Sequence, residues 1–297
     1  MLRVNGVEIE DTFAEAFKMR AARAIVTAET AGWARTAATL TSGYATSVIG
    51  CDAEVGIEAE IPAPETPDGR PGVSLLVFGF NTAALGKALV NRIGQCVMTC
   101  PTTACFNGLS PGEETVKVGA LLRFFGDGHQ ASKKLEGRRY WRVPVMDGEF
   151  LCEDTFGVQR AVAGGNFLIL AKDQAVALHA AEAAVAAIRA VPGVILPFPG
   201  GVVRSGSKVG SRYKALMAST NHELCPTLRA QVDDSQVPEG IGSVFEIVID
   251  GLAPEPVREA MRVGLAAAAN AGARQITAGN YGGNLGKHHF HLKELVP

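Results

Sequence analysis

The stretch Phe-Leu-Ile-Leu-Ala-Lys-Asp-Gln-Ala-Val-Ala-Leu-His-Ala-Ala (167–181) changes from an unbroken apolar run to an alanine-rich segment within a few residues. Its pattern predicts a strand over Phe167–Ala171 and a helix over Gln174–Ala190, and the next apolar run predicts a strand over Val194–Leu196. A second strand-helix-strand unit follows over Val244–Ile249, Pro254–Asn270 and Gln275–Ala278. Pro254 fits the first turn of its helix, because its missing N–H has no partner there in any case.

The N-terminal half repeats this order. The predicted elements are an apolar run at Ala24–Thr27, a helix over Thr30–Leu40, an apolar run at Ser47–Ile49, a strand over Val73–Phe80, a helix over Thr82–Arg92 and a strand over Gln95–Thr99. Further strands are expected at Val118–Phe125, Arg139–Val145 and Phe290–Leu292. The duplication predicts an α/β (α+β) fold of two ferredoxin-like α/β sandwich lobes, at residues 1–146 and 147–297. One doubly wound sheet is the alternative, but the helices are few and the connections long.

Composition excludes several classes of protein. The 297 residues are 47% hydrophobic and carry a formal net charge of −2, and no basic stretch is dense enough for a nucleic-acid surface. The alanine-rich run Ala175–Ala187 contains His179 and Glu182, so it cannot span a membrane. With no export signal at the N-terminus, the six cysteines indicate thiols of a cytoplasmic protein.

Three glycine-rich segments border the predicted strands of the C-terminal half, at residues 161–167, 197–211 and 278–286. Paired glycines expose backbone N–H groups and let the main chain approach a ligand, so these segments predict a site for an anionic or carbonyl-bearing ligand. The candidate binding residues are Gly164, Gly165, Asn166, Gly200, Gly201, Arg204, Ser207, Lys208 and Arg212.

Residues 197–211 nearly match a phosphate-binding P-loop, but Ser207 precedes Lys208 where the motif requires lysine first. We therefore reject a nucleotide site. Arg204, Lys208 and Arg212 can instead hold carboxylate or phosphate tails. The alternative is a solvated loop, because basic residues are common on surfaces.

Glu246 is the candidate catalytic carboxylate. Strand alternation places it on one face with Val244 and Val248. Burial among valines should raise its pKa toward neutrality, where a carboxyl group works as a general acid and base. A glutamate that faces water or pairs with an arginine is the alternative.

Other polar clusters give weaker signals. Cys96, Cys100 and Cys105 fit no zinc or redox spacing and indicate inert buried thiols, although Cys96 or Cys100 could serve an acyl hydrolase if a base lay nearby. Of three C-terminal histidines only His289 and His291 share a strand face, so we predict no metal site. Asp127 and Asp154 have ordinary turn positions and are minor candidates only.

Ten segments, in order along the chain, resemble the formylmethanofuran:tetrahydromethanopterin formyltransferase family. They are residues 5–17, 66–72, 92–99, 124–128, 163–167, 197–201, 207–211, 219–221, 246–249 and 278–283. The near-neutral charge is more similar to the versions from methylotrophic bacteria than to the acidic methanogen proteins.

This resemblance implies formyl transfer between tetrahydromethanopterin and a methanofuran-type amine in the oxidation of formaldehyde to formate. It implies two α/β lobes, a homodimer or homotetramer or a subunit of a hydrolase complex, and no metal or tightly bound cofactor. It also implies that the strand glutamate matching Glu246 is catalytic. A docking subunit of a formyl-carrier hydrolase complex, with little activity alone, is the alternative function.

The expected mechanism needs no covalent intermediate, because the nucleophile is already an amine. The enzyme aligns two large carriers and stabilises an oxyanion, for which glycine-turn N–H groups or the Asn166 amide are candidate donors. Glu246 takes the proton from the attacking nitrogen and returns it to the leaving one.

Overall fold

The computed structural model describes residues 2–44, 50–110, 112 and 114–296. The apolar run predicted at Ser47–Ile49 lies outside the described residues. The chain forms two compact units, which we call unit 1 (Met1–Lys18 and Val162–Pro297) and unit 2 (Met19–Ala161). These units do not correspond to a single cut between residues 146 and 147. Two long strands, β3 (Phe13–Thr27) and β11 (Thr155–Ala171), each contribute residues to both units. The lobe boundary at residue 146 stays a prediction.

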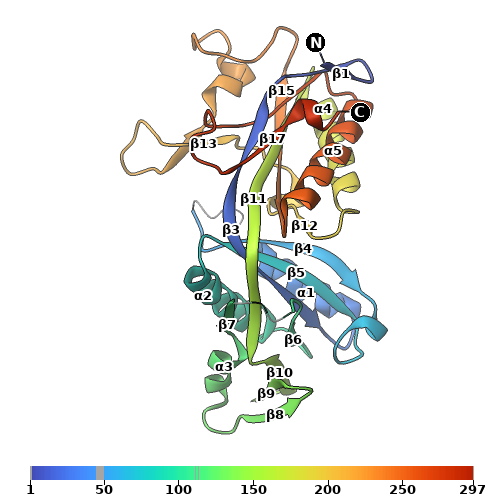
Figure 1. Cartoon of the computed structure of the whole chain (residues 1–297), viewed down its shortest axis with the longest axis vertical. Helices are drawn as coiled ribbons and strands as arrows, with labels where there is room; N and C mark the ends of the chain where they lie inside the picture. The colour runs from blue at the N-terminus through green and yellow to red at the C-terminus, as the bar shows by residue number, and fades with distance from the viewer. Residues whose placement is uncertain (1, 45–49, 111, 113, 297) are drawn as a thin grey trace. The chain divides into compact units, whose positions relative to one another are not determined.

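Unit 1 is built on a mixed sheet in the order β12-β15-β11-β16-β2-β1. Helices α4 and α5 lie against β15 in this unit (Figure 1). The bounds are β1 Leu2–Val4, β2 Val7–Ile9, α4 Gln174–Ile188, β12 Val194–Ile195, β13 Ser207–Val209, β14 Ala218–Thr220, β15 Ser243–Gly251, α5 Pro254–Asn270, β16 Gln275–Thr277 and β17 His288–His291. Strand β17 pairs with the start of β3, and β13 and β14 form a separate hairpin.

Small residues let the two helices of unit 1 approach each other. The face of α4 that is buried carries Ala177, Ala180, Ala181 and Ala184. On α5, an added Cβ at Gly264 would lie 2.6 Å from Ile188, so a larger residue there would push the helices apart. The alanine-rich sequence of α4 therefore reflects helix packing rather than a membrane span.

Unit 2 carries a sheet in the order β4-β5-β3-β6-β10-β9-β8, while β7 pairs with the start of β11. The bounds are α1 Ala31–Gly43, β4 Glu54–Ile61, β5 Gly72–Gly79, α2 Thr82–Arg92, β6 Ala104–Asn107, β7 Glu114–Lys117, α3 Gly119–Leu122, β8 Ala131–Leu135, β9 Arg138–Val145 and β10 Gly148–Glu153. Short 3-10 turns lie at Ala63–Glu65 and Arg123–Gly126.

Local sequence explains where the long helices begin. The side chains of Thr30, Asn81 and Asp173 accept N–H bonds at the starts of α1, α2 and α4, which satisfies donors that a helix leaves unpaired. Pro254 begins α5. The predictions for α2 and α5 are confirmed to the residue. Among the described helices, none combines the length and the apolar character that crossing a bilayer requires.

Two predicted strands are wrong. The run Gln95–Thr99 instead falls in a π-helical turn, Ile93–Val97, that continues α2, followed by a tight turn. The run Val118–Phe125 forms α3 and a 3-10 turn. Both runs are short and apolar, and such runs fit a buried helical turn as well as a strand. The remaining predicted elements that lie among the described residues are confirmed, and the α/β class holds.

Candidate functional site

Glu246 lies in the middle of β15, with Leu168 of β11 directly opposite. Phe245, Ile247 and Ile249 point into the core, while Glu246 lies on the other face and is only partly exposed. Burial raises the pKa of its carboxyl group from the ordinary 4.5 to about 7, as the sequence predicted. Glu246 is therefore poised to gain and lose a proton near neutral pH.

The backbone of Glu246 also anchors the second glycine-rich segment. Val203 donates its N–H to the Glu246 carbonyl at 2.8 Å, and the Glu246 N–H donates to the Val203 carbonyl at 3.1 Å. This bridge brings the chain that carries Arg204 alongside the backbone of Glu246. Just before it, Gly200 and Gly201 have φ values of 66° and 91°, which favour glycine.

Tyr281, in the third glycine-rich segment, interacts electrostatically with Glu246. Burial and the charge of Glu246 both raise the pKa of the phenol, which therefore keeps its proton at neutral pH. The backbone N–H of Val209 acts in the opposite direction and lowers this pKa, without cancelling the rise. Sequence analysis did not single out Tyr281, because it treated residues 278–286 only as a source of backbone N–H groups.

Asn166 joins the first and third glycine-rich segments. Its amide donates to the carbonyls of Gly164 and Gly279, at 3.2 and 3.1 Å, and its side-chain oxygen accepts the Gly279 N–H at 2.6 Å. Gly165 lies at a register shift of β11, where an added Cβ would come within 2.4 Å of Val257. In this structure the Asn166 amide is thus engaged by the main chain.

A cavity of about 810 Å³ lies beside the β13–β14 hairpin. Lys208 and Arg212, two of the three predicted cations, line it together with Ser211, Ser219 and Thr220. The structure therefore brings hydroxyl groups and two positive charges into one hollow, which suits an anionic group. Arg204 and Ser207 are exposed and do not line this cavity. The predicted glycines Gly164, Gly165, Gly200 and Gly201 do not line it either.

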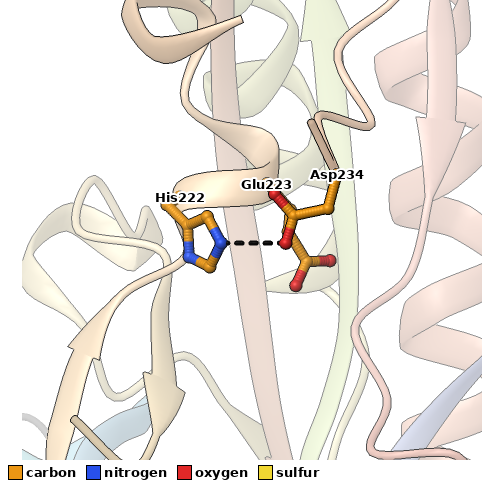
Figure 2. Close-up of side chains that lie close together, drawn as sticks. All are labelled: His222, Glu223 and Asp234. Atoms are coloured by element: carbon orange, nitrogen blue, oxygen red, sulfur yellow. Dashed lines mark hydrogen bonds and ion pairs between the residues drawn. The ribbon is translucent and has the colours of Figure 1, made fainter. Parts of the chain in front are cut away.

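Lys208 is held by a chain of side chains that sequence analysis did not anticipate. Its Nζ atom lies 2.8 Å from Nδ1 of His222, and Nε2 of His222 lies 3.0 Å from Oδ2 of Asp234. Figure 2 shows His222 and Asp234 joined by this bond, with Glu223 next to them. Because an ammonium group only donates, Nδ1 accepts and Nε2 donates to the carboxylate.

His222, Glu223 and Asp234 offer ligand atoms that all lie within 4.8 Å of one another, a spacing that can hold a metal ion. The ammonium group of Lys208 faces the same imidazole, and Glu223 also accepts a bond from Gln236 at 2.6 Å. These contacts indicate that the main role of His222 and its carboxylate neighbours is to hold Lys208 in position.

The minor candidates have structural surroundings. Burial raises the pKa of the Cys96 and Cys100 thiols, which disfavours the reactive thiolate. The rings of His289 and His291 pack against Phe13, with centroids 4.9 and 5.3 Å away. Asp127 has a φ of 49° at a turn, and Asp154 accepts the indole N–H of Trp141 at 2.5 Å.

The comparisons with known proteins cover the whole chain. The family model for "Formylmethanofuran-tetrahydromethanopterin formyltransferase" matches residues 2–145, and the model "FTR, proximal lobe" matches residues 148–295. The formyltransferase of that name from Methylobacillus flagellatus is 58% identical, with 99% of each chain covered. A protein from Methylorubrum extorquens that is named as one of the subunits of a formyltransferase/hydrolase complex is 55% identical over 99% of this chain and 97% of its own.

Solved structures give the same result. The formyltransferase/hydrolase complex of Methylorubrum extorquens with methylofuran contains a chain that is 53% identical, with a TM-score of 0.95 and coverage of 100% of this chain and 99% of that one. The formyltransferase from Methanosarcina barkeri is 49% identical, with a TM-score of 0.93 and coverage of 99% and 100%.

Proposed function

Because the chain belongs to the formylmethanofuran–tetrahydromethanopterin formyltransferase family, it is an enzyme of formyl transfer between tetrahydromethanopterin and a methanofuran-type amine, and we propose that Glu246 is its acid–base group. The observation that supports this role is a partly buried strand carboxyl group whose pKa is about 7. A group with this pKa is present in both protonation states at working pH.

In the proposed reaction the amine nitrogen of one carrier attacks the formyl carbon bound to the other. A new C–N bond forms, the carbonyl electron pair moves to oxygen, and Glu246 takes the proton from the attacking nitrogen. When the carbonyl re-forms, the old C–N bond breaks and Glu246 returns the proton to the leaving nitrogen. The enzyme ends unchanged, and alignment of the two carriers supplies much of the acceleration.

The cavity beside the hairpin is the proposed site for the acidic tail of a carrier. Its two cations, Lys208 and Arg212, are the charges suited to a carboxylate or phosphate. For Gly164, Gly165, Asn166, Gly200, Gly201, Arg204 and Ser207, contact with a carrier stays a prediction, as does the absence of a metal or a tightly bound cofactor.

The test is a spectrophotometric assay of formyl-tetrahydromethanopterin with and without a methanofuran-type amine. We expect amine-dependent loss of the formyl-pterin signal. Glu246→Gln should lower kcat by about 10²–10⁴ while the KM values change little. The matched control is Glu239→Gln, an exposed glutamate of unit 1. Turnover of Glu246→Gln within about tenfold of the native enzyme would refute the acid–base role.

A docking role in a larger assembly is a second function that one comparison favours. A relative that is 55% identical is named as a subunit of a formyltransferase/hydrolase complex. We propose that this chain also assembles, as a homodimer or homotetramer or with hydrolase subunits, and that it works in the cytoplasm. Co-purification of hydrolase subunits with the tagged chain tests the mixed complex. A species that contains only this chain and has the mass of two or four copies would favour the homo-oligomer.

A further inference from the structure

The β13–β14 hairpin carries large hydrophobic side chains that remain exposed. Unit 1 exposes six such side chains among the residues that the structure describes, and four of them belong to the hairpin, namely Val209, Tyr213, Leu216 and Met217. Tyr213 is 68% exposed and Leu216 is 55% exposed. Single exposed apolar side chains are ordinary, but a group of them in one place indicates a surface that binds something.

The loop that presents these side chains is folded by its own hydrogen bonds. The N–H of Tyr213 donates to the hydroxyl of Ser211 at 3.0 Å, and the carbonyl of Tyr213 accepts the N–H of Leu216 at 3.0 Å. The N–H of Gly210 donates to the carbonyl of Met217 at 2.8 Å. The backbone of Tyr213 is thus bonded on both sides, and its ring is exposed from a turn of defined shape.

Three of the four exposed hydrophobic side chains line the cavity that was described above as an anion site. Val209, Tyr213 and Leu216 share its wall with the two cations, Lys208 and Arg212. A small inorganic anion needs the cations alone. A ligand that joins an anionic group to an aromatic ring uses both kinds of wall, because the ring can pack on the phenol of Tyr213 while the anion binds the cations.

The charges of the cavity also favour a small anionic ligand. No carboxylate occurs among the described residues that line it, and the imidazole of His222 lines it beside the ammonium group of Lys208. Contacts between protein copies are generally poor in lysine, so a cavity that holds a lysine in a fixed place fits a small molecule better than a second copy of the chain.

We propose that this cavity binds the part of a carrier in which an anionic group adjoins an aromatic ring, with Lys208 and Arg212 on the anion and Tyr213 against the ring. The proposal rests on the proposed role of the cavity as the site of an acidic tail, and it narrows the ligand to an aryl anion. His222 is a positioning residue of this site, because it acts on the ligand only through the ammonium group of Lys208.

The test is inhibition of formyl transfer by phenyl phosphate and by methyl phosphate, two esters with the same anionic group. Both should compete with the carrier that has the acidic tail, and the Ki of phenyl phosphate should be about tenfold lower, because the ring is partly buried. Tyr213→Ser should raise the Ki of phenyl phosphate to that of methyl phosphate, whereas Tyr213→Phe should retain the difference. Leu178→Ser, at an exposed leucine outside the cavity, is the control.

Two replacements of His222 test its positioning role. Asparagine places an oxygen near the position of Nδ1 and can still accept from Lys208, whereas glutamine reaches the position of Nε2 and keeps only the contact with Asp234. His222→Gln should therefore raise the Ki of both esters about tenfold, as Lys208→Met does, and His222→Asn should stay within about threefold of the native enzyme. Equal Ki values in the two His222 variants would contradict the positioning role.

The outcomes separate this inference from the proposed function. Equal Ki values for the two esters in the native enzyme would overturn the inference, and a rise of both in Lys208→Met would leave the anion site standing. A Tyr213→Ser variant that keeps the preference for the phenyl ester, or whose oligomeric mass in light scattering changes, would assign the apolar wall to a second copy and overturn the inference. If neither ester inhibits the native enzyme, the tail-binding role of the cavity fails, and the inference with it.

Discussion

The ammonium group of Lys208 contacts the imidazole of His222, with 2.8 Å between Nζ and Nδ1. Asp234 fixes the far side of that ring, so a carboxylate, an imidazole and an ammonium group form one line that ends at the cavity wall. A flexible lysine on a hairpin is thereby given a fixed position. That arrangement supports the proposal that the cavity binds an anionic group.

Loss of the Lys208 charge should weaken the binding of a carrier. Lys208→Met should raise the KM of the carrier with the acidic tail by about tenfold or more, because hydrogen bonds to charged groups contribute about 1.5–3 kcal/mol. Steady-state kinetics at low salt measures it, and kcat should stay the same. Lys214→Met, at an exposed lysine in the loop between β13 and β14, is the control. Equal KM values in the two variants would contradict the tail-binding role.

Replacement of Gly165 by alanine should destabilise the fold. In Gly165→Ala the new Cβ would lie 2.4 Å from Cγ1 of Val257, where α5 packs on β11. Overpacking of this kind costs about 1–3 kcal/mol in the free energy of unfolding. Thermal denaturation measures it against Gly43→Ala, where the added methyl group meets no heavy atom within 4 Å. A Gly165→Ala variant as stable as Gly43→Ala would show that the helix and sheet adjust freely.

Removal of the Glu246 charge should stabilise the fold at high pH. The folded pKa of about 7 exceeds the ordinary 4.5, so between these values the native state binds more protons than the unfolded state. The free energy of unfolding of the native enzyme therefore falls as pH rises through this window. Glu246→Gln lacks this loss and should be more stable than the native enzyme at pH 8, by on the order of 1 kcal/mol.

Unfolding by guanidinium at pH 5 and pH 8 measures the stability difference between Glu246→Gln and the native enzyme. Glu15→Gln is a useful comparison, because the pKa shift of Glu15 has the opposite direction. Burial opposes ionisation of Glu15, but four backbone N–H donors outweigh it and lower the pKa, so its ionised form stabilises the fold at pH 8. Glu15→Gln should accordingly be less stable than the native enzyme there. Equal pH dependence for Glu246→Gln and the native enzyme would show that Glu246 titrates at its ordinary value.

The sequence predicted the parts of the fold that depend on local patterns. Periodicity located α2 and α5, and alternation placed Glu246 on its strand face. Local patterns could not separate a π-helical turn at Ile93–Val97 from a strand, because both bury short apolar runs. That failure concerned the type of element and left the α/β class intact.

The supports of the site depend on contacts between distant segments. Glu15 binds N–H groups that lie 266 to 271 residues away in the chain, and no spacing rule connects them. One local signal was present, since Glu15 stands in the apolar run Phe-Ala-Glu-Ala-Phe (13–17), much as Glu246 stands among valines. Lys208 was expected to hold an acidic tail, and its contact with His222 could not be foreseen because it requires the folded hairpin.

The pH dependence of kcat/KM in Glu246→Gln and the native enzyme tests the central claim most directly. The native profile should rise with pH and level off near pH 7, as the Glu246 carboxyl group loses its proton and becomes able to accept one from the attacking amine. In Glu246→Gln the rate should be about 10²–10⁴ lower and the bend near pH 7 should be gone. The same bend in both proteins, or a Glu246→Gln rate within about tenfold of the native one, would contradict acid–base catalysis by Glu246.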